Sequence, residues 1–221
     1  MDLLRSVLNE AEFLANTRKN AQMRKIPVLD YSAGRFLEAL CFLKKPEKML
    51  EIGCGIGYST YFLLKHFTEM TAKEKAKEGD CIYAYTGIDL NKKRLEEAQG
   101  FIKGAFPQLY ASGQIKISFI NANAIKVVPK LDKKYDFVFI DAAKFEYPAY
   151  LAAIEPKLQK GALVVADNIF YSGKIFKEGV SPHDRNSVKG LKEFMENIHS
   201  SDKYSTEFYD ISDGISVSVF K

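Results

Sequence analysis

Short apolar runs alternate with amphipathic segments along most of the chain. The runs are rich in Val, Ile, Phe and Tyr, which is typical of buried strands. The segments between them repeat apolar residues every three or four positions, which is typical of helices packed on a sheet. The strands predicted in this way are 49–52, 81–88, 115–120, 135–140 and 162–166, and the helices are 58–67, 91–106, 125–131, 148–158 and 188–198.

This alternation predicts an α/β fold in which helices cover both faces of a doubly wound, mostly parallel sheet. Two further strand-like runs close the chain at 204–209 and 215–220, with Asp213-Gly214 between them. We therefore expect a seven-stranded sheet in which the last two strands add an antiparallel edge strand.

Two additional helices are predicted before the first strand. Apolar residues from Leu3 to Leu14 and from Ala33 to Cys41 have helical spacing, and Asp30 or Ser32 can cap the second helix. We expect this N-terminal part, residues 1–45, to cover the acceptor side of a site or to form the interface of a homodimer.

Length and composition narrow the class of protein. The 221 residues suit a single domain with its core in 46–221, and 47% hydrophobic residues exclude a disordered chain. The 32 Lys and Arg residues exceed the 28 Asp and Glu residues by only 4, too little to indicate nucleic acid by itself. No apolar run approaches the roughly 20 residues of a membrane helix. The three cysteines lack disulfide or zinc spacing, so we expect a cytoplasmic protein. Residues 71–80 are rich in charge, and we expect them to form an exposed loop.

A glycine-rich loop follows the first predicted strand. The segment 51–59 reads EIGCGIGYS, and its glycines allow a tight turn and the close approach of a ligand to a helix N-terminus. Asp89 ends the next strand, where a carboxylate can accept both hydroxyls of a ribose. The pairing favours a nucleoside-binding site over an ordinary strand-to-helix turn.

The details of this loop discriminate between nucleoside ligands. Its G-x-G-x-G spacing differs from the G-x-G-x-x-G of dinucleotide sites. Glu51, just before the glycines, would repel a pyrophosphate but would suit an ammonium group. Both features favour S-adenosylmethionine over NAD, which leaves an NAD-dependent oxidoreductase as a distant alternative.

Acidic residues also end two later strands. Asp141 follows one strand and Asp167-Asn168 follows the next, and parallel strands bring their carboxyl ends to one edge of a sheet. Oxygen ligands of this kind suit Mg²⁺ or a similar divalent cation, which would lower the pKa of a substrate hydroxyl. The alternative is that both acids cap the helices that follow. Lys144 is placed to act as a base, because burial beside a metal lowers the pKa of a lysine.

The segments LEIGCGIGYST and GIDL resemble the first motif and the ribose-binding acid of class I methyltransferases. From about Pro27 to the C-terminus, the chain more narrowly resembles the cation-dependent O-methyltransferases of the catechol and caffeoyl-CoA type. The resemblance implies a Rossmann-like class I methyltransferase fold, with S-adenosylmethionine and Mg²⁺ as cofactors.

The resemblance also implies a cofactor site. Glu51 and Ser59 would contact the amino and carboxylate groups of the methionine moiety, and Asp89 the ribose. Asn123 would contact the adenine, at a position where family members often have Asp. The implied set is Glu51, Gly53, Gly55, Gly57, Tyr58, Ser59, Asp89, Leu90, Asn123, Ala124 and Asp141.

FIDAAK and ADN coincide with the metal-ligand motifs of the same family. The resemblance therefore implies that Asp141, Asp167 and Asn168 hold the cation. It also implies that Lys144 is the general base, with Asp141 as the second catalytic residue. A regulatory domain that had lost its chemistry would lack one of these residues, and none is missing.

Two acceptors remain open. One is a small catechol-like phenol, and Tyr147 and Tyr171 beside the acidic motifs are candidates to line its pocket. The other is a hydroxylated uridine in tRNA, because KIPV, Ala143 in FIDAAK and the closing DGISVSVFK resemble the bacterial tRNA 5-hydroxyuridine methyltransferases. The lysines that would form a basic rim for phosphates are Lys44, Lys45, Lys48, Lys174 and Lys177.

Overall fold

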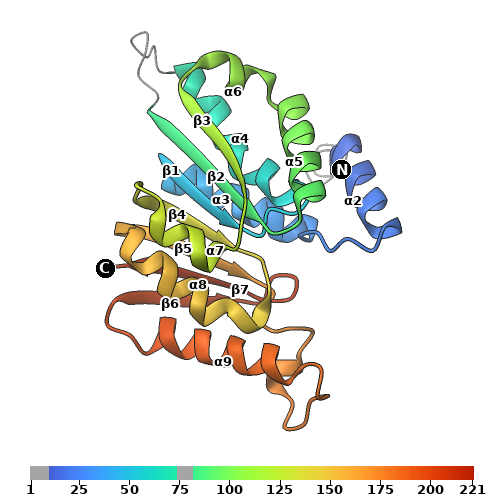
Figure 1. Ribbon diagram of the computed structural model, residues 1–221, viewed down its shortest axis with the longest axis vertical. Coiled ribbons are helices and arrows are strands. Elements are labelled where there is room, and N and C mark those ends of the chain that lie inside the picture. The colour runs from blue at the N-terminus through green and yellow to red at the C-terminus, as the bar shows by residue number, and fades with distance from the viewer. Residues whose placement is uncertain (1–9, 74–81) are drawn as a thin grey trace, which may run out of the picture.

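The computed structural model describes residues 10–73 and 82–221, and its centre is a seven-stranded sheet (Figure 1). The strands lie in the order β3-β2-β1-β4-β5-β7-β6. Neighbours from β3 to β5 are parallel, and β7 is antiparallel to both β5 and β6. The strands are β1 (Lys48–Ile52), β2 (Tyr83–Asp89), β3 (Ile115–Asn121), β4 (Tyr135–Ile140), β5 (Leu158–Asp167), β6 (Tyr204–Tyr209) and β7 (Ile215–Phe220). The predicted sheet is confirmed, with β7 inserted one place inside the edge strand β6.

Helices cover both faces of this sheet (Figure 1). One face carries α2 (Glu12–Met23), α3 (Tyr31–Lys44), α4 (Tyr58–Lys73), α5 (Lys92–Ala105) and α6 (Pro107–Ser112). The other carries α7 (Ala124–Val127), α8 (Tyr147–Ile154) and α9 (Arg185–His199). Short 3-10 helices are η1 (Val128–Lys130), η2 (Lys144–Glu146), η3 (Glu155–Lys157) and η4 (Lys174–Phe176).

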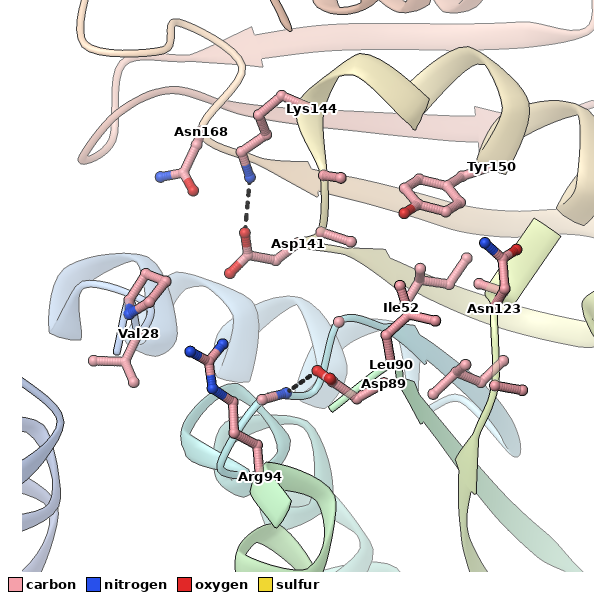
Figure 2. Close-up of a pocket in the computed structure, with 18 residues that line it drawn as sticks. Val28, Ile52, Asp89, Leu90, Arg94, Asn123, Asp141, Lys144, Tyr150 and Asn168 are labelled. Carbon is pink, nitrogen blue, oxygen red and sulfur yellow. Dashed lines mark hydrogen bonds and ion pairs between the residues drawn. The ribbon is translucent and has the colours of Figure 1, made fainter. Parts of the chain in front are cut away.

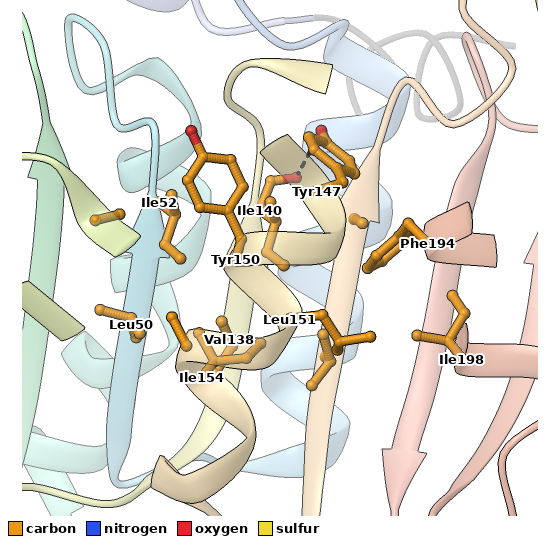
Figure 3. Packing of buried hydrophobic residues seen from close by; sticks show 14 of the residues in the cluster. Leu50, Ile52, Val138, Ile140, Tyr147, Tyr150, Leu151, Ile154, Phe194 and Ile198 are labelled. Carbon is orange, nitrogen blue, oxygen red and sulfur yellow. Dashed lines mark hydrogen bonds between the residues drawn. The ribbon is translucent and has the colours of Figure 1, made fainter. Parts of the chain in front are cut away.

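Alternation along the central strands divides the core into two clusters. Leu50 and Val138 face the cluster beneath α8 and α9, as Figure 3 shows, whereas Met49 and Phe137 face the cluster beneath α3 and α4. All four side chains are fully buried. Because successive side chains of a strand point to opposite faces, a continuous apolar run builds a sheet that is covered on both sides.

The observed elements differ from the predicted ones mainly at their ends. Most of the predicted helix 3–14 lies outside the described residues, and helix α2 instead runs from Glu12 to Met23. A separate helix, α6, begins at Pro107, because proline suits a first helical position and cannot continue a helix from its interior. Of the predicted loop 71–80, residues 71–73 belong to α4, which corrects that part, and the rest is outside the described residues. Strand β5 begins at Leu158, four residues earlier than expected, because α8 already ends at Ile154.

Helix α3 begins where the sequence predicts. The Asp30 side chain accepts a hydrogen bond from the Ser32 backbone N–H at 2.9 Å, which identifies Asp30 as the N-cap. Across residues 10–73 and 82–221, none of the helices has the length and apolarity needed to cross a bilayer.

The order of the sheet reverses between β1 and β4, which places the carboxyl ends of these two strands side by side. Ile52 of β1 pairs with Ile140 of β4, and the Asp141 N–H donates to the Ile52 carbonyl at 2.9 Å. Gly53 and Asp141 therefore follow their strands as direct neighbours. A ligand site in an open α/β sheet is expected at such a point of reversal.

Helix α9 approaches η2, the turn that carries Lys144, through a glycine. A Cβ on Gly190 would lie 2.8 Å from the Phe145 Cα and 2.9 Å from the Lys144 carbonyl oxygen. Both contacts are with backbone, so any larger residue must push the helix and the turn apart. Gly190 thus sets how closely α9 supports the Lys144 turn.

We expect Gly190→Ala to lower the free energy of unfolding by about 1–3 kcal/mol, because overpacking against backbone forces a shift of both elements. Gly100→Ala is the matched control, since Gly100 is also helical but its added Cβ would meet no atom within 4 Å. That control should gain up to about 1 kcal/mol from helix propensity. Urea unfolding of both variants measures the contrast, and equal changes would contradict the proposed role of Gly190.

Candidate active site

A cavity of about 370 Å³ opens at the carboxyl edge of the sheet, above the junction of β1 and β4 (Figure 2). Its size is in the range of small-molecule sites. Apolar and small residues form most of its wall, with a few charged and amide side chains among them. The lining residues are Pro27, Val28, Ile52, Gly53, Gly55, Ile88, Asp89, Leu90, Arg94, Ala122, Asn123, Ala124, Asp141, Ala142, Ala143, Lys144, Tyr150 and Asn168.

The three glycines of the loop have different structural roles. Gly53 has φ +94°, and a Cβ there would lie 2.1 Å from the Asp141 carbonyl oxygen, so only glycine fits. Gly55 lines the cavity, and its N–H donates to the Asp89 carboxylate at 2.8 Å. Gly57 does not line the cavity. A Cβ on it would lie 3.1 Å from the Ala98 Cα, so Gly57 lets α4 and α5 pack closely instead.

Asp89 sits at the middle of the cavity floor, at the end of β2. One carboxylate oxygen accepts from the Gly55 N–H, and the other accepts from the Asn91 N–H at 2.7 Å. Each oxygen can accept a further hydrogen bond, so the carboxylate is held in place and still able to bind two hydroxyl groups. Leu90 beside it is 66% exposed and forms part of the wall.

Asn123 lies at the end of the cavity near Tyr150 (Figure 2). Its side-chain oxygen accepts from the Lys126 N–H at 3.2 Å and caps helix α7. This leaves the amide NH₂ as the group that can donate to a ligand. Ala124 follows in the cavity wall.

Glu51 faces away from the cavity, because it shares the face of β1 that packs against α4. Its side chain is fully buried and accepts hydrogen bonds from the hydroxyls of Ser59, Thr60 and Tyr85. Burial raises the pKa of Glu51, and these hydroxyls oppose the rise. The carboxylate therefore ties the end of β1 to the first turn of α4.

Tyr58 and Ser59 are likewise turned into the protein. Tyr58 is buried and donates its hydroxyl to Glu10, and Ser59 donates to Glu51. Of the predicted cofactor residues, Glu51, Gly57, Tyr58 and Ser59 are thus absent from the cavity wall. The other seven line it: Gly53, Gly55, Asp89, Leu90, Asn123, Ala124 and Asp141.

Asp141 and Lys144 meet at the opposite end of the cavity from Asn123 (Figure 2). The Lys144 ammonium donates to the Asp141 carboxylate at 2.8 Å and to the Tyr147 hydroxyl at 2.8 Å. The Tyr147 hydroxyl in turn donates to the Asp167 backbone carbonyl at 2.9 Å. The turn after β4 is thereby connected to the end of β5.

Lys144 holds its proton firmly with these partners. Burial disfavours the charged ammonium, but attraction and hydrogen bonds from Tyr147 and Asp141 outweigh burial and raise the pKa of Lys144. The expected lowering of the Lys144 pKa refers to a bound metal, whereas among the protein's own side chains the opposite charge of Asp141 favours the charged ammonium.

Asp167 and Asn168 complete this end of the site from β5. Asn168 lines the cavity with a left-handed backbone (φ +54°), whereas Asp167 is only 1% exposed and lies behind it. One carboxylate oxygen of Asp167, Oδ1, has no hydrogen-bond partner within the described residues. Burial and then the charge of Asp141 raise the pKa of Asp167 to about 7. A buried carboxylate oxygen without a partner is costly, and a bound cation would supply the missing partner.

These residues fit a divalent cation by donor type. Two carboxylates and an amide are the oxygen donors that Mg²⁺ prefers. In the described ranges there is no group of three or more His, Cys, Asp and Glu residues arranged to hold a metal.

Residues 5–220, nearly the whole chain, match the model of the O-methyltransferase family. The chain belongs to the O-methyltransferase family.

Named relatives agree with this assignment. The chain is 26% identical over 174 residues to a caffeoyl-CoA O-methyltransferase of Stellaria longipes, covering 75% of this chain and 65% of that protein. It is 28% identical over 165 residues to a catechol O-methyltransferase of Niastella koreensis, covering 73% and 65%. The matches thus span 65% of the length of each of these relatives.

Solved structures show the same fold at low identity. The O-methyltransferase TomG from Streptomyces achromogenes, in complex with S-adenosylmethionine, has a TM-score of 0.73 at 22% identity, covering 100% of this chain and 95% of that one. An O-methyltransferase from Bacillus cereus has a TM-score of 0.72 at 19% identity, covering 97% and 93%.

Several expectations for the acceptor side of this O-methyltransferase family member are wrong. Tyr147 is fully buried and supports Lys144, and the Tyr171 hydroxyl donates to Asp184 at 3.0 Å, so neither lines the cavity. The tyrosine on the cavity wall is Tyr150. The sequence held no signal for this choice beyond the position of Tyr150 one helical turn after Tyr147.

The five lysines of the expected basic rim do not come together. Lys48 opens β1, and Lys44 and Lys45 end α3 just before it, so these three lie at the edge of the sheet opposite the cavity. On the cavity side, Lys174 donates to Asp184 at 2.9 Å. The sequence grouped these five lysines because it could not show which end of the sheet each one reaches.

Arg94, Val28 and Ile52 are cavity residues that sequence reasoning missed. Arg94 lies in the first turn of α5, shortly after the predicted ribose acid. The signal available in the sequence was the position of Arg94 in the first turn of a helix that starts at the ligand-binding edge of the sheet.

The raised pKa of Asp167 predicts a pH-dependent cost to folding. Between its ordinary pKa of 3.8 and about 7, the folded protein holds a proton that the unfolded chain has released. The unfolded state then binds fewer protons, so this group lowers the free energy of unfolding as pH rises through that window. Asp167→Asn removes the cost, so with EDTA present the variant should match wild type near pH 4 and exceed it by about 1 kcal/mol or more at pH 8.

Urea unfolding across this pH range measures the difference between the variant and wild type. Asp132→Asn, at an exposed position, is the control and should show no such trend. A variant that is less stable than wild type at pH 8 would contradict the prediction.

Proposed function

We propose that this family member is an S-adenosylmethionine-dependent and divalent-metal-dependent O-methyltransferase that acts on a ring hydroxyl of a catechol-like small molecule. The observation that carries the proposal is one continuous cavity. It has Asp89 at its centre, Asn123 at one end, and Asp141, Lys144 and Asn168 at the other.

The adenosine part of the cofactor fits the half of the cavity built from β2 and β3. Asp89 offers two carboxylate oxygens to the ribose hydroxyls, and Asn123 offers an amide donor to an adenine ring nitrogen. Leu90 and Tyr150 provide apolar and aromatic surface for a flat base. In this orientation the sulfonium methyl points towards Asp141 and Lys144.

Asp141, Asp167 and Asn168 would hold a divalent cation. The support is the unpartnered Asp167 oxygen together with the oxygen-only donor set. When bound, the cation would supply positive charge that lowers the pKa of an acceptor hydroxyl.

Lys144 lies at the same end of the cavity and would accept the proton that leaves the acceptor hydroxyl. The Lys144 ammonium donates to the Asp141 carboxylate at 2.8 Å, and this contact stabilises the protonated lysine. A second positive charge at Asp141 would compete for that carboxylate and lower the pKa of Lys144. Lys144 is then the nearest group that can accept the hydroxyl proton.

The arrangement of lysines supports a small acceptor over tRNA. Three of the five candidate lysines lie at the far edge of the sheet, and Lys174 is paired with Asp184. A cavity wall of small and apolar residues suits a planar ring. Methyl transfer itself asks for alignment and a deprotonated oxygen, because the sulfonium is already a good leaving group.

The test is methyl transfer from labelled S-adenosylmethionine with Mg²⁺, offered to a catechol panel and to tRNA carrying 5-hydroxyuridine. We expect transfer to the catechols and its loss with EDTA. Lys144→Met should lower kcat about 100-fold or more, as for loss of a general base. Lys177→Gln is the matched control and should leave the rate unchanged, since Lys177 is exposed and outside the cavity wall.

Mg²⁺ should also raise the melting temperature of wild type but not of Asp167→Asn. Transfer that ignores EDTA would overturn the metal assignment. Transfer to tRNA alone would replace the acceptor class, and no transfer to either acceptor would overturn the proposal.

A further inference from the structure

Arg94 stands out among the charged residues of the cavity. It is half-buried in the first turn of α5 with its guanidinium directed into the cavity (Figure 2). Within residues 10–73 and 82–221 it makes no hydrogen bond or ion pair through its side chain. Glu97, one turn further along the helix, is held by Arg24 at 2.6 and 2.8 Å. The hydrogen bond from Arg24 lowers the pKa of the Glu97 carboxyl, and Arg94 adds to this lowering only through its charge. A partly buried guanidinium whose N–H groups have no hydrogen-bonded anion indicates that a ligand supplies one.

The shape of the cavity indicates which part of a bound ligand would reach Arg94. Asn123 and Tyr150 form one end, and Lys144 and Asn168 form a second (Figure 2). Arg94 and Val28 form a third wall, away from both (Figure 2). S-adenosylmethionine has three branches at its sulfonium: the adenosine, the methyl group and the amino-acid chain. With adenosine at the first end and the methyl group towards the second, the amino-acid chain is left for the third wall.

The charges on the cavity wall agree with this placement. Its charged side chains are Asp89, Arg94, Asp141 and Lys144, and Lys144 is already paired with Asp141. Arg94 is therefore the cation on this wall that remains available to a carboxylate. Ser59, the expected partner of that carboxylate, is buried and donates its hydroxyl to Glu51.

Resting on the proposed function, we propose that Arg94 binds the carboxylate of S-adenosylmethionine. The guanidinium fork can donate two parallel hydrogen bonds to a carboxylate, which fixes the direction of the amino-acid chain. Arg94 would thus be a cofactor-binding residue that orients the methyl group by holding the branch opposite to it.

The test compares two ligands by calorimetry: S-adenosylmethionine and its decarboxylated analogue, which differ only in the carboxylate. Arg94→Gln should weaken binding of S-adenosylmethionine about tenfold or more and leave binding of the analogue unchanged. Arg94→Lys should recover part of the loss, because it keeps the charge without the fork. Lys93→Gln removes one positive charge from the adjacent, exposed position and should change neither affinity.

Thermal unfolding of Arg94→Gln and Arg94→Lys separates a folding defect from a binding defect. Equal weakening of both ligands by Arg94→Gln, or no weakening of either, would overturn the role of Arg94. An unchanged cofactor affinity with a raised KM for the acceptor would also overturn it and assign Arg94 to an acceptor anion. If wild type fails to bind S-adenosylmethionine at all, the proposed function itself fails, which is a distinct result.

Discussion

The site depends on how closely β1 and β4 approach at their carboxyl ends. A single methyl group at position 53 would lie 2.1 Å from the Asp141 carbonyl oxygen, so the junction exists only with glycine there. Because the two strands are neighbours where the sheet order reverses, the glycine loop and Asp141 share one cavity. Every other group of the site is placed relative to this junction.

Behind the cavity, buried polar groups hold the junction in shape. Glu51 ties β1 to α4 through three hydroxyls, and Tyr147 links the Lys144 ammonium to the backbone of Asp167. Such groups are costly to bury unless they are paired, so each pairing restricts the local geometry. The residues that face the cavity are thus positioned by residues that do not.

The same pairing sets the charge state at the reactive end. Asp141 stabilises the Lys144 ammonium, while burial and Asp141 together raise the pKa of Asp167 to about 7. The Asp141 carboxylate therefore favours the protonated forms of both Lys144 and Asp167. A cation bound beside it would have the opposite effect on both groups. The chain belongs to the O-methyltransferase family, and the wall around these groups limits the shape of the ligands that can reach them.

The amino-acid pattern by itself determined the layered α/β fold and the residues that end the strands, including Asp89, Asp141 and Asn168. Strand and helix periodicity is local, and parallel strands necessarily bring their carboxyl ends to one edge. Only the tertiary structure decided that Glu51 and Ser59 satisfy each other, that the lysines divide between two edges, and that Arg94 enters the cavity. These outcomes depend on which partner each side chain meets across the fold, and contacts between distant segments leave no trace in local periodicity.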